Sequence, residues 1–306
     1  MDETFFAGVD GGGTRTTLVL ASADGRELAR AEGPAGLVDP RHPERSAEVI
    51  AGLVREAVGG LGPGGRVPAA LCAGLAGVGN EAERVAVEEA LAELGVAGRV
   101  RVASDGEIAL EGAFGGGAGI LLIAGTGSVA YGRAGDGRME RCGGWGMIVG
   151  DEGSGYALGR EGLKAALRSV DGREPPTPLL DRFLDTLGLE HAREIPPWAG
   201  RVEKADVAAL AREVLEAAAL DDAVSMRVVR AQAAELAGHV GALASRLAPW
   251  PGEVPVVFHG GVLQNDLFAS LVSGHLGDTG HACRVRPPRA DAVHGALAYA
   301  RALVHA

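Results

Sequence analysis

The chain has 306 residues, a length that allows two domains of ordinary size. Hydrophobic residues make up 47% of it, which indicates a globular core, while the net charge of −11 argues against a basic surface for nucleic acid or an anionic membrane. No stretch approaches the roughly 20 apolar residues that span a bilayer, and the first four residues are acidic where a signal peptide would be basic. We therefore expect a cytoplasmic protein with neither membrane nor nucleic-acid partners.

The rare residue types exclude several kinds of site. Cys72, Cys142 and Cys283 are far apart and form no Cys-x-x-Cys pair, which argues against a disulfide framework and against a zinc or iron–sulfur site. Lysine occurs only at positions 164 and 204, and no Gly-Lys-Ser/Thr is present, so the sequence contains no P-loop.

The N-terminal residues predict a β-hairpin that recurs later in the chain. Residues 5–9 are apolar and end in Asp10-Gly11-Gly12-Gly13-Thr14, residues 16–21 are again apolar, and Asp24-Gly25 is a turn signal before a third strand at residues 26–31. The same layout follows residues 119–124, with Gly125-Thr126-Gly127-Ser128 and then Asp136-Gly137 after the same interval. We interpret this as an internal duplication; the alternative is a chance likeness of two glycine-rich hairpins.

Helices and strands alternate between the two hairpins. Residues 43–61 and 80–94 have the spacing of helices, and residues 67–73 and 99–103 that of buried strands. After the second hairpin we expect a strand over residues 254–259 and helices over 154–168, 178–187, 204–220, 222–247, 265–276 and 292–303. The alternation predicts an α/β fold that binds ligands at the carboxyl ends of its strands.

The first glycine turn offers groups that suit a phosphate. Backbone N–H groups, the hydroxyls of Thr14 and Thr16 and the carboxylate of Asp10 belong to one tight turn. Such a nest binds phosphate oxygens, and Asp10 could hold Mg²⁺ directly or through water. Because the turn leads into a strand rather than a helix, a Rossmann motif is excluded. A purely structural hairpin is the alternative.

Two later glycine motifs extend this interpretation. The turn at residues 125–128 is the equivalent of the first one, and two matching hydroxyl-bearing turns could hold a polyphosphate from both sides of a cleft. Gly260-Gly261 follows a strand, where a double glycine would admit a flat ring such as adenine against bare backbone. An ordinary strand-to-helix turn is the alternative for the double glycine.

Asp105 follows a predicted strand between the two turns. A carboxylate at this place could accept the proton of an attacking hydroxyl, a contribution of about 10²- to 10⁴-fold in rate. Asp is also a good helix N-cap, and residues 108–114 have helical character. Position alone slightly favours the cap.

A glycine-rich segment around one Trp is typical of a sugar-binding wall. Cys142-Gly143-Gly144-Trp145-Gly146 leads to Gly150-Asp151-Glu152-Gly153-Ser154, so that a Trp face could pack on a pyranose while acids accept hydroxyl protons. The alternative is a core Trp with Asp151 or Ser154 capping the next helix.

Together these motifs resemble the N-acetylglucosamine kinase family, which belongs with the BadF/BadG-type ATPases in the superfamily of actin, hexokinase and the heat-shock chaperone ATPases. The match runs through most of the chain in five ordered anchors. The most specific is Gly143-Gly144-Trp145-Gly146 with Gly150-Asp151-Glu152-Gly153-Ser154. The others are residues 8–14, residues 125–128, Gly260-Gly261-Val262 and Gly295-Ala296-Leu297.

The resemblance implies two actin-like, ribonuclease H-like domains with ATP and an amino sugar in the cleft between them. The expected domains are residues 1–113, with the helix at 291–306 packed back on them, and residues 114–290, with a helical insertion. The implied partners are a small-molecule sugar and a second copy in a homodimer. The implied reaction is phosphorylation of N-acetylglucosamine or glucosamine at the 6-hydroxyl.

The resemblance also implies roles for single residues. Asp105 would be the catalytic base, and Asp10 would serve Mg²⁺. ATP would be bound by Gly11, Gly12, Gly13, Thr14, Thr126, Gly127, Gly260 and Gly261. The sugar would be lined by Ser128, Gly144, Trp145, Gly146 and Asp151.

Two departures from the family leave the identity of the sugar open. The loop at residues 33–40 lacks the Asn with which relatives commonly contact the sugar, and Ala76 stands where some relatives have a hydroxyl. N-acetylmuramic acid or another sugar therefore remains an alternative. Two other functions also remain: an ATPase of the 2-hydroxyacyl-CoA dehydratase activator type, which would need closely placed cysteines, and a non-catalytic sugar sensor.

Overall fold

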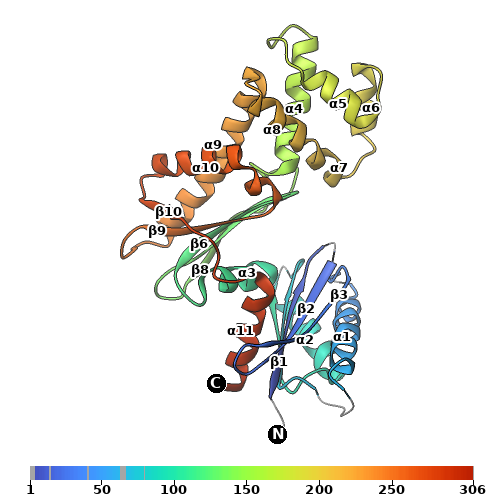
Figure 1. The fold of residues 1–306 in the computed structure, drawn as a ribbon, viewed down its shortest axis with the longest axis vertical. Helices are drawn as coiled ribbons and strands as arrows, with labels where there is room; N and C mark the ends of the chain where they lie inside the picture. The colour runs from blue at the N-terminus through green and yellow to red at the C-terminus, as the bar shows by residue number, and fades with distance from the viewer. Residues whose placement is uncertain (1–3, 14, 40, 63–66, 79, 306) are drawn as a thin grey trace. The chain divides into compact units, whose positions relative to one another are not determined.

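A computed structural model describes residues 4–13, 15–39, 41–62, 67–78 and 80–305. The chain forms two compact units, one of residues Met1–Gly117 with Pro288–Ala306 and one of residues Ala118–Pro287 (Figure 1). Each unit is built on its own five-stranded mixed sheet.

The sheet of the first unit has the strand order β3-β2-β1-β4-β5. Its strands are β1 (Phe5–Gly11), β2 (Arg15–Ser22), β3 (Glu27–Pro34), β4 (Ala70–Leu75) and β5 (Val100–Ser104). β1, β2 and β3 form an antiparallel meander, whereas β1, β4 and β5 run parallel. The carboxyl ends of β1, β4 and β5 therefore lie at one edge of the sheet.

Helices cover both faces of this sheet because β1 is apolar on both sides. Phe5, Ala7 and Val9 point into a core with α1 (Pro43–Gly59) and α2 (Glu81–Glu93). Phe6 points to the opposite face, where α3 (Asp105–Phe114) and α11 (Ala292–His305) complete a second cluster.

The last helix approaches α3 very closely. A Cβ on Gly295 would lie 1.9 Å from the carbonyl oxygen of Ile108, and one on Gly112 would lie 2.2 Å from that of Asp291. Only glycine lets the two backbones approach this far, which gives a packing reason for the glycine of the Gly295-Ala296-Leu297 motif. The contact fixes α3, the helix that begins at Asp105.

The sheet of the second unit has the order β10-β9-β6-β7-β8. Its strands are β6 (Gly119–Ala124), β7 (Ser128–Arg133), β8 (Met139–Gly143), β9 (Val254–His259) and β10 (Cys283–Val285). Read from the other edge, each strand has the same place and direction as its counterpart in the first sheet. This common topology supports the duplication inferred from the hairpins.

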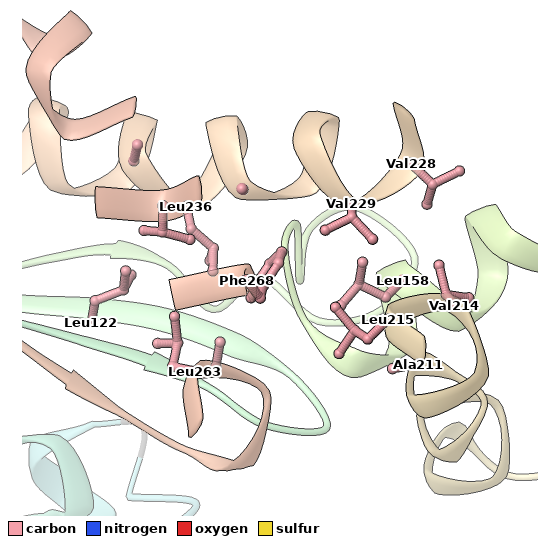
Figure 2. Close-up of a cluster of buried hydrophobic side chains, with 14 of the residues drawn as sticks. Leu122, Leu158, Ala211, Val214, Leu215, Val228, Val229, Leu236, Leu263 and Phe268 are labelled. Atoms are coloured by element: carbon pink, nitrogen blue, oxygen red, sulfur yellow. The ribbon is translucent and has the colours of Figure 1, made fainter. Parts of the chain in front are cut away.

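A helical segment connects β8 to β9. It comprises α4 (Gly155–Val170), α5 (Leu179–Leu187), α6 (Ile195–Ala199), α7 (Lys204–Ala209), α8 (Ala211–Ala219) and α9 (Ala223–Arg246), and α10 (Asp266–Leu276) follows β9. Figure 2 shows part of the hydrophobic core of the second unit. In it, Phe268 of α10 lies among Leu122 of β6, Leu158 of α4, Leu215 of α8 and other apolar side chains. Within the described chain no helix has the length and apolar character needed to cross a membrane.

The elements depart from the sequence predictions at a few places. The helix expected over residues 204–220 is interrupted at Leu210, whose N–H bonds the carbonyl of Val207 three residues back, so that two helices result. The short edge strand β10 was not predicted, whereas β8 follows the second Asp-Gly turn, where the repeated layout implies a strand. The strand expected over residues 67–73 begins later than predicted, since β4 starts at Ala70.

Candidate functional site

The first glycine turn stands at the carboxyl end of β1. Asp10 pairs across the hairpin with Thr17, and both line a hollow of about 270 Å³ together with Gly12, Gly13 and Arg15. Gly11 is the buried last residue of β1 and precedes the hollow, and its carbonyl accepts a hydrogen bond from Ala76 N at 2.8 Å. The turn thus combines a carboxylate, a hydroxyl and bare backbone, a set that fits a phosphate with its counter-ion.

The two threonines of the first hairpin differ from expectation. Thr16 is fully buried and donates its hydroxyl to the carbonyl of Pro34 at 2.7 Å, so the predicted phosphate role of this hydroxyl is wrong. Thr17 replaces it in the hollow, because successive residues of a strand point to opposite faces. Thr14, the other predicted phosphate contact, lies outside the described residues.

Asp105 is the first residue of α3 and is not its cap. Ser104 is the N-cap, with its hydroxyl accepting from Glu107 N at 3.2 Å, and the Glu107 carboxylate accepts from Ser104 N at 2.7 Å. This capping box satisfies the helix terminus. The slight preference for Asp105 as the cap is therefore wrong, and its carboxylate is left to accept from Gly106 N at 2.8 Å.

Asp105 lies at the same sheet edge as Asp10. Gly11 pairs with Leu75 of β4, and Leu75 pairs with Ser104 of β5, so two strand spacings of about 4.8 Å separate the backbones that carry the two acids. The Asp105 side chain is open to solvent on one side, yet the protein around it disfavours the charged form and raises the pKa of this carboxyl. A raised pKa is typical of a general base.

The second glycine turn and the double glycine meet in the second unit. β6 and β9 run parallel, and Ile123 pairs with His259, which brings the turn at residues 125–127 beside Gly260. Gly260 has a φ of 97°, and a Cβ there would lie 2.4 Å from the carbonyl oxygen of Ala124. Thr126, in the turn, is exposed. The predicted phosphate and adenosine motifs of this unit thus lie side by side at the carboxyl ends of β6 and β9.

The N-terminus of α4 supports the second turn. Gly155 N donates to Gly125 O at 2.8 Å, and Tyr156 N donates to Thr126 O at 3.3 Å. These bonds use amides that have no partner inside the helix, and they fix the turn from behind.

The glycine-rich segment after β8 presents its Trp to solvent. Gly143, Gly144 and Gly146 have positive φ, so the backbone turns sharply around Trp145, whose side chain is 67% exposed. The Arg141 guanidinium lies over the Trp145 ring at 4.9 Å. Trp145 is therefore not a core residue, and it offers an aromatic surface of the kind that packs on a sugar.

Asp151 and Ser128 lie in the interior next to the second turn. Asp151 is only 3% exposed, has a φ of 58°, and accepts a hydrogen bond from Ser128 N at 3.3 Å. The Ser128 hydroxyl donates to the carbonyl of Glu152 at 2.6 Å. Ser154 caps α4, as the alternative interpretation of this segment proposed.

The structure adds Lys204, which the sequence interpretation overlooked. Its Nζ lies 2.6 Å from Oδ2 of Asp151, and a Cβ on Gly127 would lie 2.8 Å from the same nitrogen. No local pattern could reveal this pair, because the two residues are 53 positions apart and meet only through the packing of α7 on α4.

The cysteines do not form a common site. Cys72 is buried in β4 of the first unit, whereas Cys142 and Cys283 lie on β8 and β10 at opposite edges of the second sheet. The part of the chain that the structure describes contains no group of three or more His, Cys, Asp or Glu arranged to hold a metal. An iron–sulfur cluster held within one chain is not compatible with this placement.

Comparison with known proteins identifies the family. Residues 7–300 match the BadF/BadG/BcrA/BcrD ATPase family. The chain belongs to this family. A curated relative from Clostridium acetobutylicum, named N-acetylmuramic acid/N-acetylglucosamine kinase, is 36% identical to this BadF/BadG-type ATPase over 264 residues, which cover 85% of the chain and 86% of the relative.

Solved structures resemble this member of the BadF/BadG/BcrA/BcrD ATPase family over nearly its whole length. One from Chromobacterium violaceum, described as a candidate N-acetylglucosamine kinase, has a TM-score of 0.78 and 30% identity, with 96% of the chain and 98% of that structure covered. One from Porphyromonas gingivalis with the same description has a TM-score of 0.72 at 21% identity, covering 99% and 100%, and supports the fold alone. The expected two-domain actin-like α/β fold is confirmed.

Proposed function

We propose that this protein transfers the γ-phosphoryl group of ATP to the 6-hydroxyl of an amino sugar, N-acetylglucosamine or glucosamine. The observation that carries the proposal is the 36% identity, over most of both chains, to a protein named as a kinase of N-acetylmuramic acid and N-acetylglucosamine. Membership of an ATPase family supports ATP as the phosphoryl donor. The uncapped carboxylate of Asp105 at a strand end supports a group that accepts a hydroxyl proton.

ATP would be bound by the backbone of the glycine turns. Gly11, Gly12, Gly13 and Thr14 of the first unit and Thr126 and Gly127 of the second would contact the phosphates, and Gly260 with Gly261 would admit the adenosine. Asp10 fits a Mg²⁺ ion, because this metal takes one or two carboxylates and completes its shell with water and phosphate oxygens. When bound, the ion would neutralise charge that develops on the phosphates.

The sugar would pack on the segment after β8. Gly144, Trp145 and Gly146 would provide its exposed wall, in agreement with the exposure of the Trp145 ring. Ser128 and Asp151 would complete the wall from the interior, where they are joined to each other through the Ser128 N–H. Asp151 would accept a hydrogen bond from a sugar hydroxyl.

Asp105 would act as the general base. Its carboxylate would accept the proton of the 6-hydroxyl while the sugar oxygen forms a bond to the γ-phosphorus and the bond from that phosphorus to the β,γ-bridging oxygen breaks, so that ADP leaves. Positioning and charge stabilisation supply most of the catalysis in such transfers. The raised pKa of Asp105 suits this role, because a stronger base accepts the proton more readily.

Several wider expectations belong to the same proposal. We infer that residues 1–113 with 291–306, and residues 114–290, act as the two actin-like domains of a cytoplasmic homodimer.

An ADP-release assay tests the function across glucosamine, N-acetylglucosamine, N-acetylmannosamine, N-acetylmuramic acid and glucose. We expect ADP release that rises with an amino sugar and stops when a chelator removes Mg²⁺. ATP consumption without any sugar, by a coloured protein, would instead favour the dehydratase activator type. Stoichiometric sugar binding without phosphate transfer would favour a sensor.

A further inference from the structure

One ion pair joins α7 to Asp151, which lies beside the glycine turn of the second unit. Lys204 is the first residue of α7, and its ammonium nitrogen lies 2.6 Å from Oδ2 of Asp151. The Lys204 side chain is partly exposed, whereas the Asp151 side chain is almost wholly buried. A buried carboxylate that loses its partner is strongly destabilising, because the desolvated charge is then uncompensated.

Glycines on α4 bring Lys204 to this place. A Cβ on Gly159 would lie 2.0 Å from the carbonyl oxygen of Val207, and one on Gly155 would lie 3.2 Å from that of Ala208. α7 can therefore rest directly on the backbone of α4, and its first residue reaches the turn that α4 also supports through Gly155 N. The pair is thus built into the packing of two helices, unlike the flexible ion pairs of a surface.

Asp151 links Lys204 to the glycine turn at residues 125–128. Its other oxygen, Oδ1, accepts from Ser128 N and would lie 2.8 Å from a Cβ on Gly127. Its backbone carbonyl accepts from the Ser154 hydroxyl at 2.6 Å, which anchors the segment after the exposed Trp to the start of α4. Asp151 therefore contacts the turn at residues 125–128 and α7 through its carboxylate, and it belongs to the segment that follows Trp145.

We propose that Lys204 is a positioning residue that holds Asp151 against the Gly127-Ser128 turn, so that the sugar-binding segment after β8 is ordered before the sugar binds. This inference rests on the proposed function and names a residue that acts through Asp151 rather than on the phosphates. Sugar affinity should therefore depend on Lys204 more strongly than nucleotide affinity does.

The test compares Lys204→Met and Lys204→Arg with Lys164→Met. Lys164 is the matched control because it is the other lysine of the chain and pairs with Glu161 on the exposed side of α4. We expect Lys204→Met to raise the KM for the sugar about 10- to 100-fold with a much smaller change in the KM for ATP. Lys204→Arg should recover part of the loss, and Lys164→Met should behave as the unchanged protein. A rise confined to the KM for ATP would overturn the inference and make Lys204 a phosphate ligand.

A double-mutant cycle gives a second readout. Thermal unfolding is compared for the unchanged protein, Lys204→Met, Asp151→Asn and the double variant. Because Lys204→Met leaves the buried Asp151 carboxylate without its partner, whereas the double variant carries no such charge, the double variant should lose less stability than the sum of the single variants. Additive losses would overturn the inference. Absence of sugar-dependent turnover in the unchanged protein would overturn the proposed function, whereas turnover that Lys204→Met leaves intact would overturn only the role of Lys204.

Discussion

Ser104 and Asp105 divide two tasks at the start of α3. The Ser104 hydroxyl accepts the Glu107 N–H at 3.2 Å and caps the helix, while the Asp105 carboxylate accepts the N–H of its neighbour Gly106 at 2.8 Å. The helix terminus therefore does not depend on the Asp105 carboxylate. Substitutions at the two positions should separate stability from catalysis.

Replacement of Asp105 by Asn should lower sugar-dependent turnover by about 10²-fold or more, because the amide cannot accept the substrate proton. The Asn side-chain oxygen can still accept the Gly106 N–H, so the start of α3 should keep its structure and nucleotide binding should be retained. Steady-state kinetics and titration with ADP measure the two effects. Ser104→Ala is the control: it should cost about 1 kcal/mol of stability and leave turnover nearly intact. Near-normal turnover in Asp105→Asn would remove Asp105 from the mechanism.

The pH dependence follows from the raised pKa of Asp105. A base must be ionised, so kcat/KM should fall as the pH drops through a value above the ordinary range of an Asp. The same shift favours the protonated form in the folded protein. The stabilisation from it is present at a pH below the unfolded pKa and is lost as the pH rises through the folded pKa. Thermal unfolding against pH should therefore show this loss in the unchanged protein and not in Asp105→Asn; parallel curves would contradict the prediction.

A Gly260→Ala substitution should disrupt the second unit at the turn. The φ of 97° is disfavoured for any residue with a side chain, and the added Cβ would meet the Ala124 carbonyl oxygen, which is backbone and cannot move cheaply. We expect a stability loss on the order of 3 kcal/mol and weaker nucleotide binding. Gly274→Ala in α10 is the control, since a Cβ there meets nothing within 4 Å and should be neutral or slightly stabilising. Equal behaviour of the two variants in chemical unfolding would contradict the argument.

Trp145→Ala should affect sugar binding more than stability. The ring is exposed and its contact with Arg141 contributes about 0.5–1 kcal/mol at such a site. We expect the KM for the sugar to rise about tenfold, which corresponds to about 1.4 kcal/mol. Trp250→Phe should instead lower the stability and leave the KM for the sugar unchanged, because the Trp250 indole N–H donates to the Ala244 carbonyl at 2.8 Å. An unchanged sugar KM in Trp145→Ala would remove this ring from the sugar wall.

Local patterns in the sequence were sufficient for most of the fold. The apolar runs of β1 and β6 are long and are bounded by glycine turns, and both strands form where they were expected. The edge strand β10 escaped prediction because it has only three residues, Cys283–Val285, and lacks an apolar run. Such strands form only because a neighbouring strand offers unpaired backbone groups.

The candidate site divides in the same way. Glycine turns and the acid after a strand could be found because their chemistry requires those residues in adjacent positions. The sequence could not show whether Thr16 or Thr17 presents its hydroxyl in the hollow, since this depends on which face of the hairpin the following loop covers.

The sequence by itself determined the α/β fold, the duplicated hairpins and the places of Asp10, Asp105 and the glycine turns, because these follow from interactions between residues close together in the chain. Only the tertiary structure decided which groups meet: it exposed Trp145, buried Asp151 and paired it with Lys204. Contacts of this kind depend on how whole helices pack. The pairing of an acid with a lysine 53 residues away has no signature in the order of the residues between them.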